Sequence, residues 1–330
     1  MTTLITGATG FVGSAVARVM AKRGHALRLL ARPTSDRRLL DGVDAEVVTG
    51  DLTDLASLRR AAAGCQYVMH IAADYRFWVP DKDAMLRANV DGAVNMVRAA
   101  ADAGARRIVH CSSVAALGQF GDGRAADEAT PTNESDFIGI YKRSKYLAER
   151  AVLDLAAKEN LPLVVVNPAA PVGLRDIKPT PTGKMVRDAA AGRVPAYIDT
   201  GLNIVHVDDV AEGHALALER GRIGERYVLG GENLLLKDIL ALIADVAGSR
   251  PPRICLPEAL IWPVAWAMEK TAHLTGIPPI MTRDHLKMAR KKMFFSSAKA
   301  VTELGYRARP AREAVVDAVA WFRDAGMLPR

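Results

Sequence analysis

The sequence predicts an α/β protein with a doubly wound parallel sheet and a smaller mixed α/β domain toward the C-terminus. Through the first two thirds of the chain, short apolar runs alternate with stretches of helical periodicity. Apolar runs of this kind are typical of parallel strands that helices cover on both faces. After residue 168 the alternation gives way to proline-rich and mixed sequence. The length of 330 residues also exceeds the usual size of one domain, so a second unit is expected.

Each element is predicted in chain order from its own pattern. Strands are expected where apolar residues are bounded by turn residues, at 2–6, 26–31, 45–50, 66–73, 106–113 and 161–168. Helical periodicity predicts helices at 11–23, 54–63, 83–103 and 137–159. The proline-rich segment 167–183 predicts a long loop over a pocket. Residues 203–220 predict a strand with His206 near its end, followed by a helix that Asp208 or Asp209 caps.

We divide the chain into two predicted domains, each made of two pieces. The larger comprises residues 1–167 and 203–222 and carries the main sheet. The smaller comprises residues 168–202 and 223–330 and is expected to bind the substrate.

The composition narrows the class of protein. Half of the residues are hydrophobic and a quarter are charged, and no apolar run approaches the roughly 18 to 20 residues that cross a bilayer. The N-terminus enters a strand pattern with no export signal, so a cytoplasmic location is expected. The three cysteines are too widely spaced for a metal knuckle and are expected to be reduced and buried. The net charge of +7 favours an anionic partner, while sparse aromatic residues argue against nucleic acid.

Three glycines follow the first predicted strand. Residues 6–14 are TGATGFVGS, which places Gly7, Gly10 and Gly13 between that strand and the next helix. Glycine allows a tight turn and lets backbone N–H groups approach a pyrophosphate, and the helix N-terminus adds a favourable partial charge. Tight turns also occur without ligands, and the spacing GxxGxxG differs from the GxGxxG fingerprint. The position inside a strand–helix–strand pattern nevertheless favours a dinucleotide site.

The ends of the second and third strands indicate which dinucleotide is bound. An acidic residue after the second strand would bind the ribose 2′-hydroxyl of NAD, whereas Arg32 stands there and suits the 2′-phosphate of NADP. NADP is therefore the predicted cofactor, and NAD is the less favoured one. Arg37 and Arg38 are further candidates for contact with this phosphate, but they are better explained as residues of a solvated loop. Asp51 follows the third strand, where it is either an acceptor for the adenine amino group or a capping residue.

Ser113, Tyr141 and Lys145 form the predicted reactive group. Ser113 ends the fifth strand, and Tyr141 and Lys145 lie four residues apart in a helix, so they share one face. A neighbouring ammonium and an oxidised nicotinamide would lower the pKa of the tyrosine from its usual value of roughly 10. Tyr141 would then exchange a proton with a substrate oxygen that Ser113 holds, while hydride moves to or from the cofactor.

Together these motifs resemble the extended short-chain dehydrogenase/reductase family, whose fold is of the Rossmann type. They run in family order from residue 6 to residue 211 as TGATGFVG, Asp51-Leu52, HIAA, Asn89, SSVAALG, YKRSK and VHVDDVA. Further segments, among them ARPTSDRR, NPAAPVGLRDIKPTPTGK and MARKKMFFSSAKA, resemble the hopanoid-associated sugar epimerases. That subgroup is in turn similar to dihydroflavonol 4-reductases.

The resemblance implies a role for each matching residue. Ser113, Tyr141 and Lys145 would be catalytic. The implied cofactor-binding residues are Gly7, Thr9, Gly10, Phe11 and Val12 at the pyrophosphate, Asp51 and Leu52 at the adenine, Ala72 beside the ribose, and Tyr141, Lys145 and Pro168. No metal site is implied. The resemblance also implies a homodimer formed through the helices near 84–103 and 141–159.

The implied reaction is hydride transfer at an alcohol or carbonyl carbon of a sugar-like or hopanoid side-chain substrate, in hopanoid biosynthesis and lipid metabolism. Reduction by a dihydroflavonol-4-reductase-like enzyme and epimerisation of a sugar would use the same residues, so both readings stay open. Dehydration is disfavoured because Val114 and Ala115 follow Ser113, where dehydratases of the family carry carboxylates. A non-enzymatic NADP-binding regulator is the more distant alternative, since such a protein is expected to lose the serine, tyrosine or lysine.

Two further segments are candidates for contact with a substrate or a surface. Residues 75–80, YRFWVP, follow the fourth strand at the carboxyl edge of the sheet and would either stack on a ligand or plug the loop. Residues 256–268, LPEALIWPVAWAM, place Trp262 and Trp266 one helical turn apart. Burial in the second domain is the expected explanation. The alternative is a membrane-contacting face that admits a lipid-linked substrate, aided by the basic run at 290–292.

Overall fold

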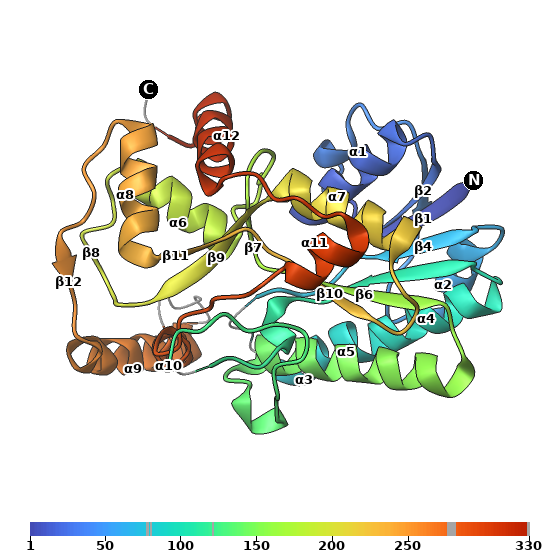
Figure 1. Cartoon of the computed structure of the whole chain (residues 1–330), viewed down its shortest axis with the longest axis horizontal. Helices are drawn as coiled ribbons and strands as arrows, with labels where there is room; N and C mark the ends of the chain where they lie inside the picture. Colours follow the sequence, from blue (N-terminus) through green and yellow to red (C-terminus); the bar gives the residue numbers. More distant parts are fainter. Residues whose placement is uncertain (77–78, 80, 121, 276–281, 329–330) are drawn as a thin grey trace.

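A seven-stranded sheet forms the centre of the computed structural model, which describes residues 1–330 except 77–78, 80, 121, 276–281 and 329–330 (Figure 1). Its strands are β1 (Thr2–Thr6), β2 (Ala26–Ala31), β3 (Glu46–Thr49), β4 (Tyr67–His70), β5 (Arg107–Cys111), β6 (Leu163–Pro168) and β10 (Arg226–Leu229). They lie in the order β10-β6-β5-β4-β1-β2-β3, and every pair is parallel. The prediction of a doubly wound parallel sheet is confirmed.

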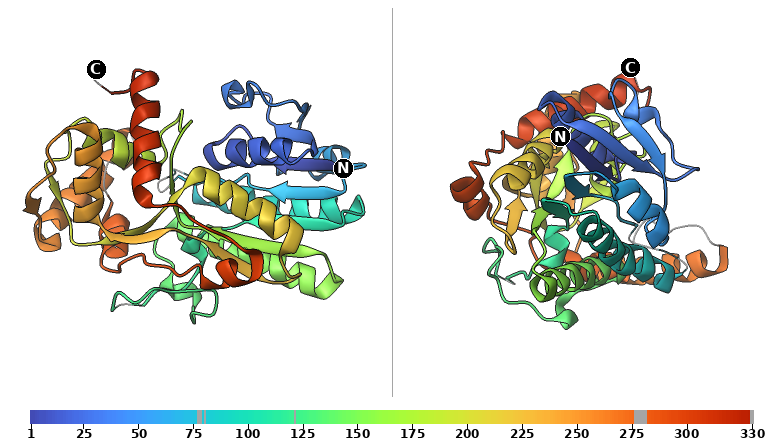
Figure 2. Two further views of the ribbon diagram at one scale, coloured as in Figure 1. Left: turned by 45° about the horizontal axis from the view of Figure 1, so that its top comes forward. Right: turned by 90° about the vertical axis from the view of Figure 1, so that its right-hand side faces the viewer.

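Helices cover both faces of this sheet. The core on one face is formed with α1 (Phe11–Lys22), α7 (Val207–Arg220) and α11 (Ala298–Leu304). The core on the other face is formed with α2 (Leu55–Ala62), α4 (Gly92–Asp102) and α5 (Ile140–Glu159). The end-on view in Figure 2 shows the twisted strands between the two helical layers.

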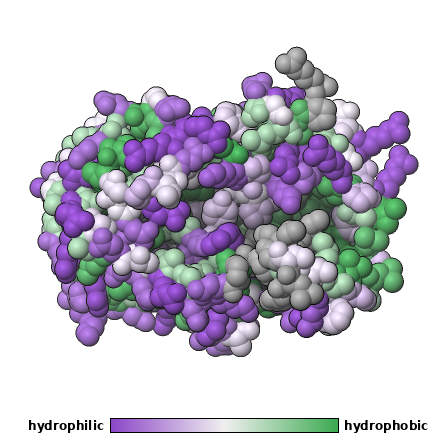
Figure 3. Space-filling model, turned by 180° about the vertical axis from the view of Figure 1, so that it is seen from behind, coloured by the Kyte–Doolittle hydropathy of each residue, from purple (hydrophilic) through white to green (hydrophobic). Residues whose placement is uncertain are grey.

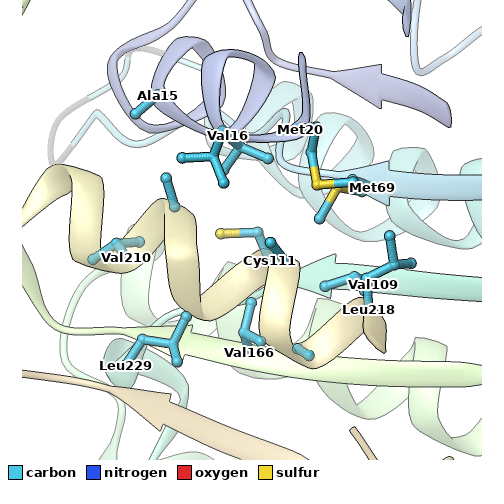
Figure 4. Packing of buried hydrophobic residues seen from close by; sticks show 14 of the residues in the cluster. Ala15, Val16, Met20, Met69, Val109, Cys111, Val166, Val210, Leu218 and Leu229 are labelled. Atoms are coloured by element: carbon cyan, nitrogen blue, oxygen red, sulfur yellow. The ribbon is translucent and has the colours of Figure 1, made fainter. Parts of the chain in front are cut away.

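Burial on both faces explains why the strands carry no polar alternation. In β5, the side chain of Ile108 joins the core with α4 and α5, while Val109 joins the core with α1 and α7. Figure 4 shows the second of these cores, where Val16 of α1 and Val210 of α7 lie in one cluster with strand residues such as Val109. Because successive strand side chains point to opposite faces, a strand covered on both sides must be apolar throughout.

A smaller region packs beside the carboxyl ends of the strands. It holds a three-stranded sheet of β7 (Ala170–Val172), β9 (Gly201–His206) and β11 (Glu232–Leu235), with a core shared by α6 (Pro181–Ala190), α8 (Leu236–Ala247) and α12 (Ala311–Asp324). The short strands β8 (Ala196–Tyr197) and β12 (Ile254–Cys255) pair with each other. Two further helices, α9 (Glu258–Thr275) and α10 (Arg283–Ala289), lie at the edge of this region (Figure 1).

The segment 167–183 differs from its prediction as one long loop. It contains β7, and α6 begins at Pro181 with Thr180 as its N-cap, whose side chain accepts a hydrogen bond from the N–H of Gly183. Proline in the first turn of a helix costs no hydrogen bond, so the prolines that suggested a loop also permit this helix start.

Two other expectations need correction. His206, rather than Asp208 or Asp209, caps α7, because its Nδ1 accepts from the N–H of Asp208 at 3.0 Å. Cys65 and Cys111 are buried as predicted, but Cys255 is exposed in the short strand β12.

The division into two domains stays a prediction, and strand pairing crosses its limits at two places. β9, assigned to the larger domain, pairs with β7 and β11 in the small sheet. β10, assigned to the smaller domain, pairs with β6 and completes the large sheet.

Candidate active site

The candidate site lies at the carboxyl ends of β1 and β4, where the strand order reverses. From β1 the chain continues outward to β2 and β3, and from β4 it continues the other way to β5 and β6. Ligands of doubly wound sheets bind at such a switch point. Thr6 and His70 end the two strands, and Thr6 Oγ1 lies 2.8 Å from His70 Nδ1 and accepts from the N–H of Ala72 at 3.2 Å.

The glycine turn after β1 has no room for side chains. Gly7 has a φ of 76°, and a Cβ there would lie 2.7 Å from the nitrogen of Ala72. A Cβ on Gly13 would lie 2.1 Å from the carbonyl oxygen of Gly7. Gly10 is the exposed N-cap of α1 and provides no side-chain cap, so it leaves the first turn accessible to an anion.

This turn brings together the predicted pyrophosphate residues Gly7, Thr9, Gly10, Phe11 and Val12. The last four are exposed or partly buried, in contrast to Gly13 and Ser14 behind them. A compact backbone turn opening onto a helix N-terminus fits the diphosphate of a dinucleotide. The backbone of Ala72 lies directly against Gly7, so it also reaches this place.

Arg32 is exposed at the end of β2, where its backbone N–H donates to Ser35 Oγ. Arg38 is paired with Asp36 at 2.6 Å on the following loop, and Arg37 is exposed there. Arg32 is thus the arginine that follows directly on the strand, at the position of the ribose contact in this fold.

Asp51 caps the turn after β3. Its Oδ1 accepts from the N–H and the hydroxyl of Thr53 at 2.9 and 2.7 Å. These hydrogen bonds, and to a smaller extent the charge of Arg32, lower the pKa of Asp51. Asp51 therefore acts as a capping residue of this turn. Its contact with adenine stays a prediction. The neighbouring Leu52 packs against Gly92 of α4.

Ser113, Tyr141 and Lys145 converge at the end of β5. Ser113 is the second residue after the strand, and Tyr141 and Lys145 lie in the first two turns of α5. The side chains of Tyr141 and Ser113 share a hydrogen bond. Lys145 is 4% exposed, and its Nζ donates to the carbonyl oxygen of Cys111 at 3.0 Å.

The titration of Tyr141 differs from the expectation of a lowered pKa. Loss of solvent around its hydroxyl raises the pKa of Tyr141 to about 12, although the hydrogen bond with Ser113 acts in the opposite direction. Burial also lowers the pKa of Lys145, whose ammonium is held at the Cys111 carbonyl. The protein side chains therefore keep Tyr141 protonated, which is the form that donates a proton.

A buried polar network holds the backbone of Ser113, and sequence reasoning missed it. Asn167 Nδ2 donates to the carbonyl oxygen of Ser113 at 3.0 Å and to Glu149 Oε2 at 2.6 Å. Glu149 is 1% exposed and accepts from Arg226 Nη1 at 2.9 Å. The network joins β6, α5 and β10 to Ser113, two residues after the end of β5. The one feature of the sequence that could have indicated this network is Glu149, which lies on the same helix as Tyr141 and Lys145.

Asn89 ties the loop after β4 to the helix that carries Tyr141. Its Oδ1 accepts from the N–H of Asp74 at 2.7 Å, and its Nδ2 donates to the carbonyl of Asp74 and to Ser144 Oγ. Asn89 lies in a π-helical turn, Arg87–Asp91, that joins α3 (Lys82–Leu86) to α4. Such turns are frequent at functional sites. The sequence motif included Asn89 without indicating this contact.

The segment after β4 and the segment 167–183 lie close enough for charges of one to act on the other. Tyr75 is exposed, and Arg76 pairs with Asp74, while Phe77, Trp78 and Pro80 lie outside the described residues. Asp176, in the segment after β7, contributes to raising the pKa of Tyr75, although burial is the larger cause. Pro168 is buried at the end of β6 and precedes the segment that holds Asp176.

Neither a metal-binding group nor a membrane-spanning helix occurs among the described residues. No group of three or more His, Cys, Asp or Glu side chains there is arranged to hold a metal ion. Of the helices in the same part of the chain, none has the length and apolar character to span a membrane.

Comparisons with known proteins agree with this geometry. The model of the NAD dependent epimerase/dehydratase family matches residues 3–230. A putative dihydroflavonol 4-reductase from Synechocystis sp. is 41% identical over 98% of this chain and 94% of its own length. Sterol demethylase protein B from Methylococcus capsulatus is 33% identical over 99% of this chain and 100% of its own. The crystal structure of gox2253 is 58% identical, covers 99% of each chain and superposes with a TM-score of 0.91.

Proposed function

The chain belongs to the NAD dependent epimerase/dehydratase family, and we propose that it is an NADP(H)-dependent oxidoreductase that reduces a carbonyl group to an alcohol. The observation that carries this proposal is the hydrogen-bonded pair of Tyr141 and Ser113 at the end of β5, with Lys145 one turn further along α5. A partly buried, protonated tyrosine beside a hydroxyl is the arrangement that a carbonyl oxygen needs when it becomes an alcohol.

The residues divide the work of the reaction between them. The glycine turn after β1 and Arg32 would hold a reduced nicotinamide cofactor at the sheet edge, and that cofactor would supply the hydride for the carbonyl carbon. Tyr141 donates its hydroxyl proton to the carbonyl oxygen, so the alcohol forms without a free alkoxide. Ser113 holds that oxygen by a hydrogen bond. Lys145, fixed at the Cys111 carbonyl, places a positive charge beside the tyrosine that has lost its proton.

The preference for NADP rests on Arg32. Its exposed guanidinium at the end of β2 suits a ribose 2′-phosphate, which a carboxylate in that position would repel. The glycine turn holds the diphosphate, and Leu52 and Asp51 border the adenine side.

Reduction is favoured over epimerisation by one observation. The curated relatives reported above include one whose name describes a reductase, over almost the whole chain. A sugar epimerase is the second candidate, because the family is named for that activity and the same residues would serve it. The proposed substrate remains a sugar-like or hopanoid side-chain carbonyl compound.

Cofactor turnover separates the two candidates. Purified protein would be incubated with NADPH and a panel of hydroxyaldehydes, keto-sugars and apolar ketones, while absorbance follows the cofactor and mass spectrometry follows the product. The proposal expects one NADPH consumed for each alcohol formed. An isomerised product without net NADPH consumption would contradict reduction and support the epimerase. Binding of NADPH without turnover of any substrate would favour a regulator.

The assembly is also a proposal. We infer a homodimer through α4 and α5, the helices that the family resemblance indicated. Light scattering of the purified protein measures this directly, since a mass near 35.5 kDa would contradict it.

A further inference from the structure

Helix α9 turns its large apolar side chains outward. Leu260, Trp262, Val264 and Trp266 are 68%, 39%, 56% and 47% exposed, whereas the small residues Ala265 and Ala272 are buried. Of the described side chains, Ala265 and Ala272 are buried and Ile261 and Met268 are partly buried, so the helix packs on the protein through this face. The prediction that its apolar stretch is buried was wrong for the four exposed residues. A cluster of exposed tryptophan and aliphatic side chains in a soluble-type fold marks an interaction surface.

The apolar face extends beyond the helix. Ile254 and Cys255 of β12, just before α9, are also exposed. Figure 3 shows hydrophobic residues gathered along the edge of the molecule over β12 and α9, at the lower right of that view. We call the set of Ile254, Leu260, Trp262, Val264 and Trp266 the α9 face.

Cationic groups lie beside both tryptophans. The ammonium of Lys270 lies 5.9 Å from the ring centre of Trp266, and the guanidinium of Arg283 lies 5.6 Å from that of Trp262. Arg253, next to Ile254, is exposed as well. Tryptophan rings flanked by lysine and arginine suit a lipid interface, where rings enter the acyl boundary and cations meet headgroup phosphates.

The nearby carboxylates leave this face positive. Glu269 accepts from Arg283 Nε at 2.6 Å, and Asp284 faces Lys287 at 4.0 Å. Lys270 and Arg253 then add positive charge, and among the described residues neither forms an ion pair with a carboxylate. In a symmetric contact between two copies, the same patch would meet itself and bring these cations together. An anionic lipid surface complements both the apolar and the charged groups.

The α9 face is connected to the helix that carries Tyr141. The bond between Glu269 and Arg283 joins α9 to α10. Asp284 of α10 then lies against Gly139, the N-cap of α5, since a Cβ there would be 3.5 Å from its carboxylate oxygen. Gly139 precedes Tyr141 by two residues, so a surface bound by α9 would lie beside the N-terminus of the catalytic helix.

We propose that the α9 face docks the protein on the surface of membranes that contain anionic lipid. Flotation with phosphatidylcholine vesicles, with and without phosphatidylglycerol, tests this. The wild-type protein is expected to float with the anionic vesicles at low salt and to be released at high salt. Trp262→Ser combined with Trp266→Ser is expected to weaken vesicle binding by about tenfold or more. Lys270→Glu is expected to weaken binding to anionic vesicles and leave the apolar face intact.

A matched control uses exposed apolar residues elsewhere. Ile223→Ser with Val301→Ser removes side chains that are 58% and 51% exposed before β10 and on α11, and it is expected to float like the wild type. Absence of flotation with any vesicle, or equal flotation of the tryptophan variant, would overturn the proposal. A lower oligomeric mass of the tryptophan variant would assign the face to a second copy and overturn it too. NADPH binding, measured on the same samples, reports separately on the proposed reaction.

Discussion

Asp176 provides a test of how burial sets the charge of this region. Its side chain is 2% exposed, at the junction between β7 and α6, and accepts from the N–H and hydroxyl of Thr180 at 2.9 and 2.8 Å. Burial nevertheless dominates and raises the pKa of Asp176 from 3.8 to about 6. The folded protein therefore holds this proton more tightly than the unfolded chain does.

The sign and size of the effect follow from that difference. Because the folded state binds more protons between the two pKa values, the free energy of unfolding falls as pH rises from about 4 to about 6. A shift of two units corresponds to about 3 kcal/mol. Asp176→Asn removes this loss but gives up one hydrogen bond from the Thr180 hydroxyl, worth about 1 kcal/mol. The variant should then be about 2 kcal/mol more stable than the wild type at pH 7.

Thermal unfolding measured at several pH values between 4 and 8 tests this reasoning. The midpoint of Asp176→Asn should exceed that of the wild type by roughly 3 °C at pH 7, and the two should converge near pH 4. Asp44→Asn, a change at an exposed aspartate, is the control and should follow the wild type. An Asp176→Asn protein less stable at pH 7, or one with the pH dependence of the wild type, would refute the argument.

Three other changes have defined outcomes. Gly13→Ala places a Cβ 2.1 Å from the Gly7 carbonyl oxygen, so the turn must shift, and calorimetry should show NADPH affinity reduced about tenfold or more. Arg32→Ala should reduce NADPH affinity by about tenfold and leave NADH affinity nearly unchanged. An equal loss of affinity for both cofactors would contradict a contact between Arg32 and the 2′-phosphate. Arg37→Ala is the control and should bind NADPH like the wild type. Asn167→Leu leaves the Ser113 carbonyl without its donor, so kcat should fall about tenfold with little change in KM, and unfolding should become easier by about 2 to 4 kcal/mol. A wild-type kcat in that variant would show that the network does not position Ser113.

Most of the large sheet was predictable because its strands are buried on both faces. Ile108 and Val109 belong to different cores, and a strand with that requirement leaves an apolar run that local reasoning detects. The assignment of β9 and β10 to sheets was not predictable in this way. Both are short and apolar, and which neighbour each one pairs with depends on the path of the whole chain.

The candidate site was predictable where its residues share one local element. Tyr141 and Lys145 are four residues apart on a helix, and Ser113 ends a strand, so spacing alone brought them together. The network of Glu149, Asn167 and Arg226 joins three distant segments, and charged residues on a helix are normally expected in solvent. The prediction for the α9 face was wrong for the opposite reason. Apolar residues normally indicate burial, whereas Trp262 and Trp266 are exposed.

The most direct test of the proposed reaction is the turnover of Tyr141→Phe with NADPH and the best carbonyl substrate found in the panel. Tyr146→Phe, on the same helix, serves as the control. Loss of the proton donor predicts that kcat falls by roughly 10² to 10⁴-fold while NADPH affinity stays within about twofold of the wild type. A Tyr141→Phe enzyme that turns over at the rate of the Tyr146→Phe control would contradict the assignment of Tyr141 as the acid.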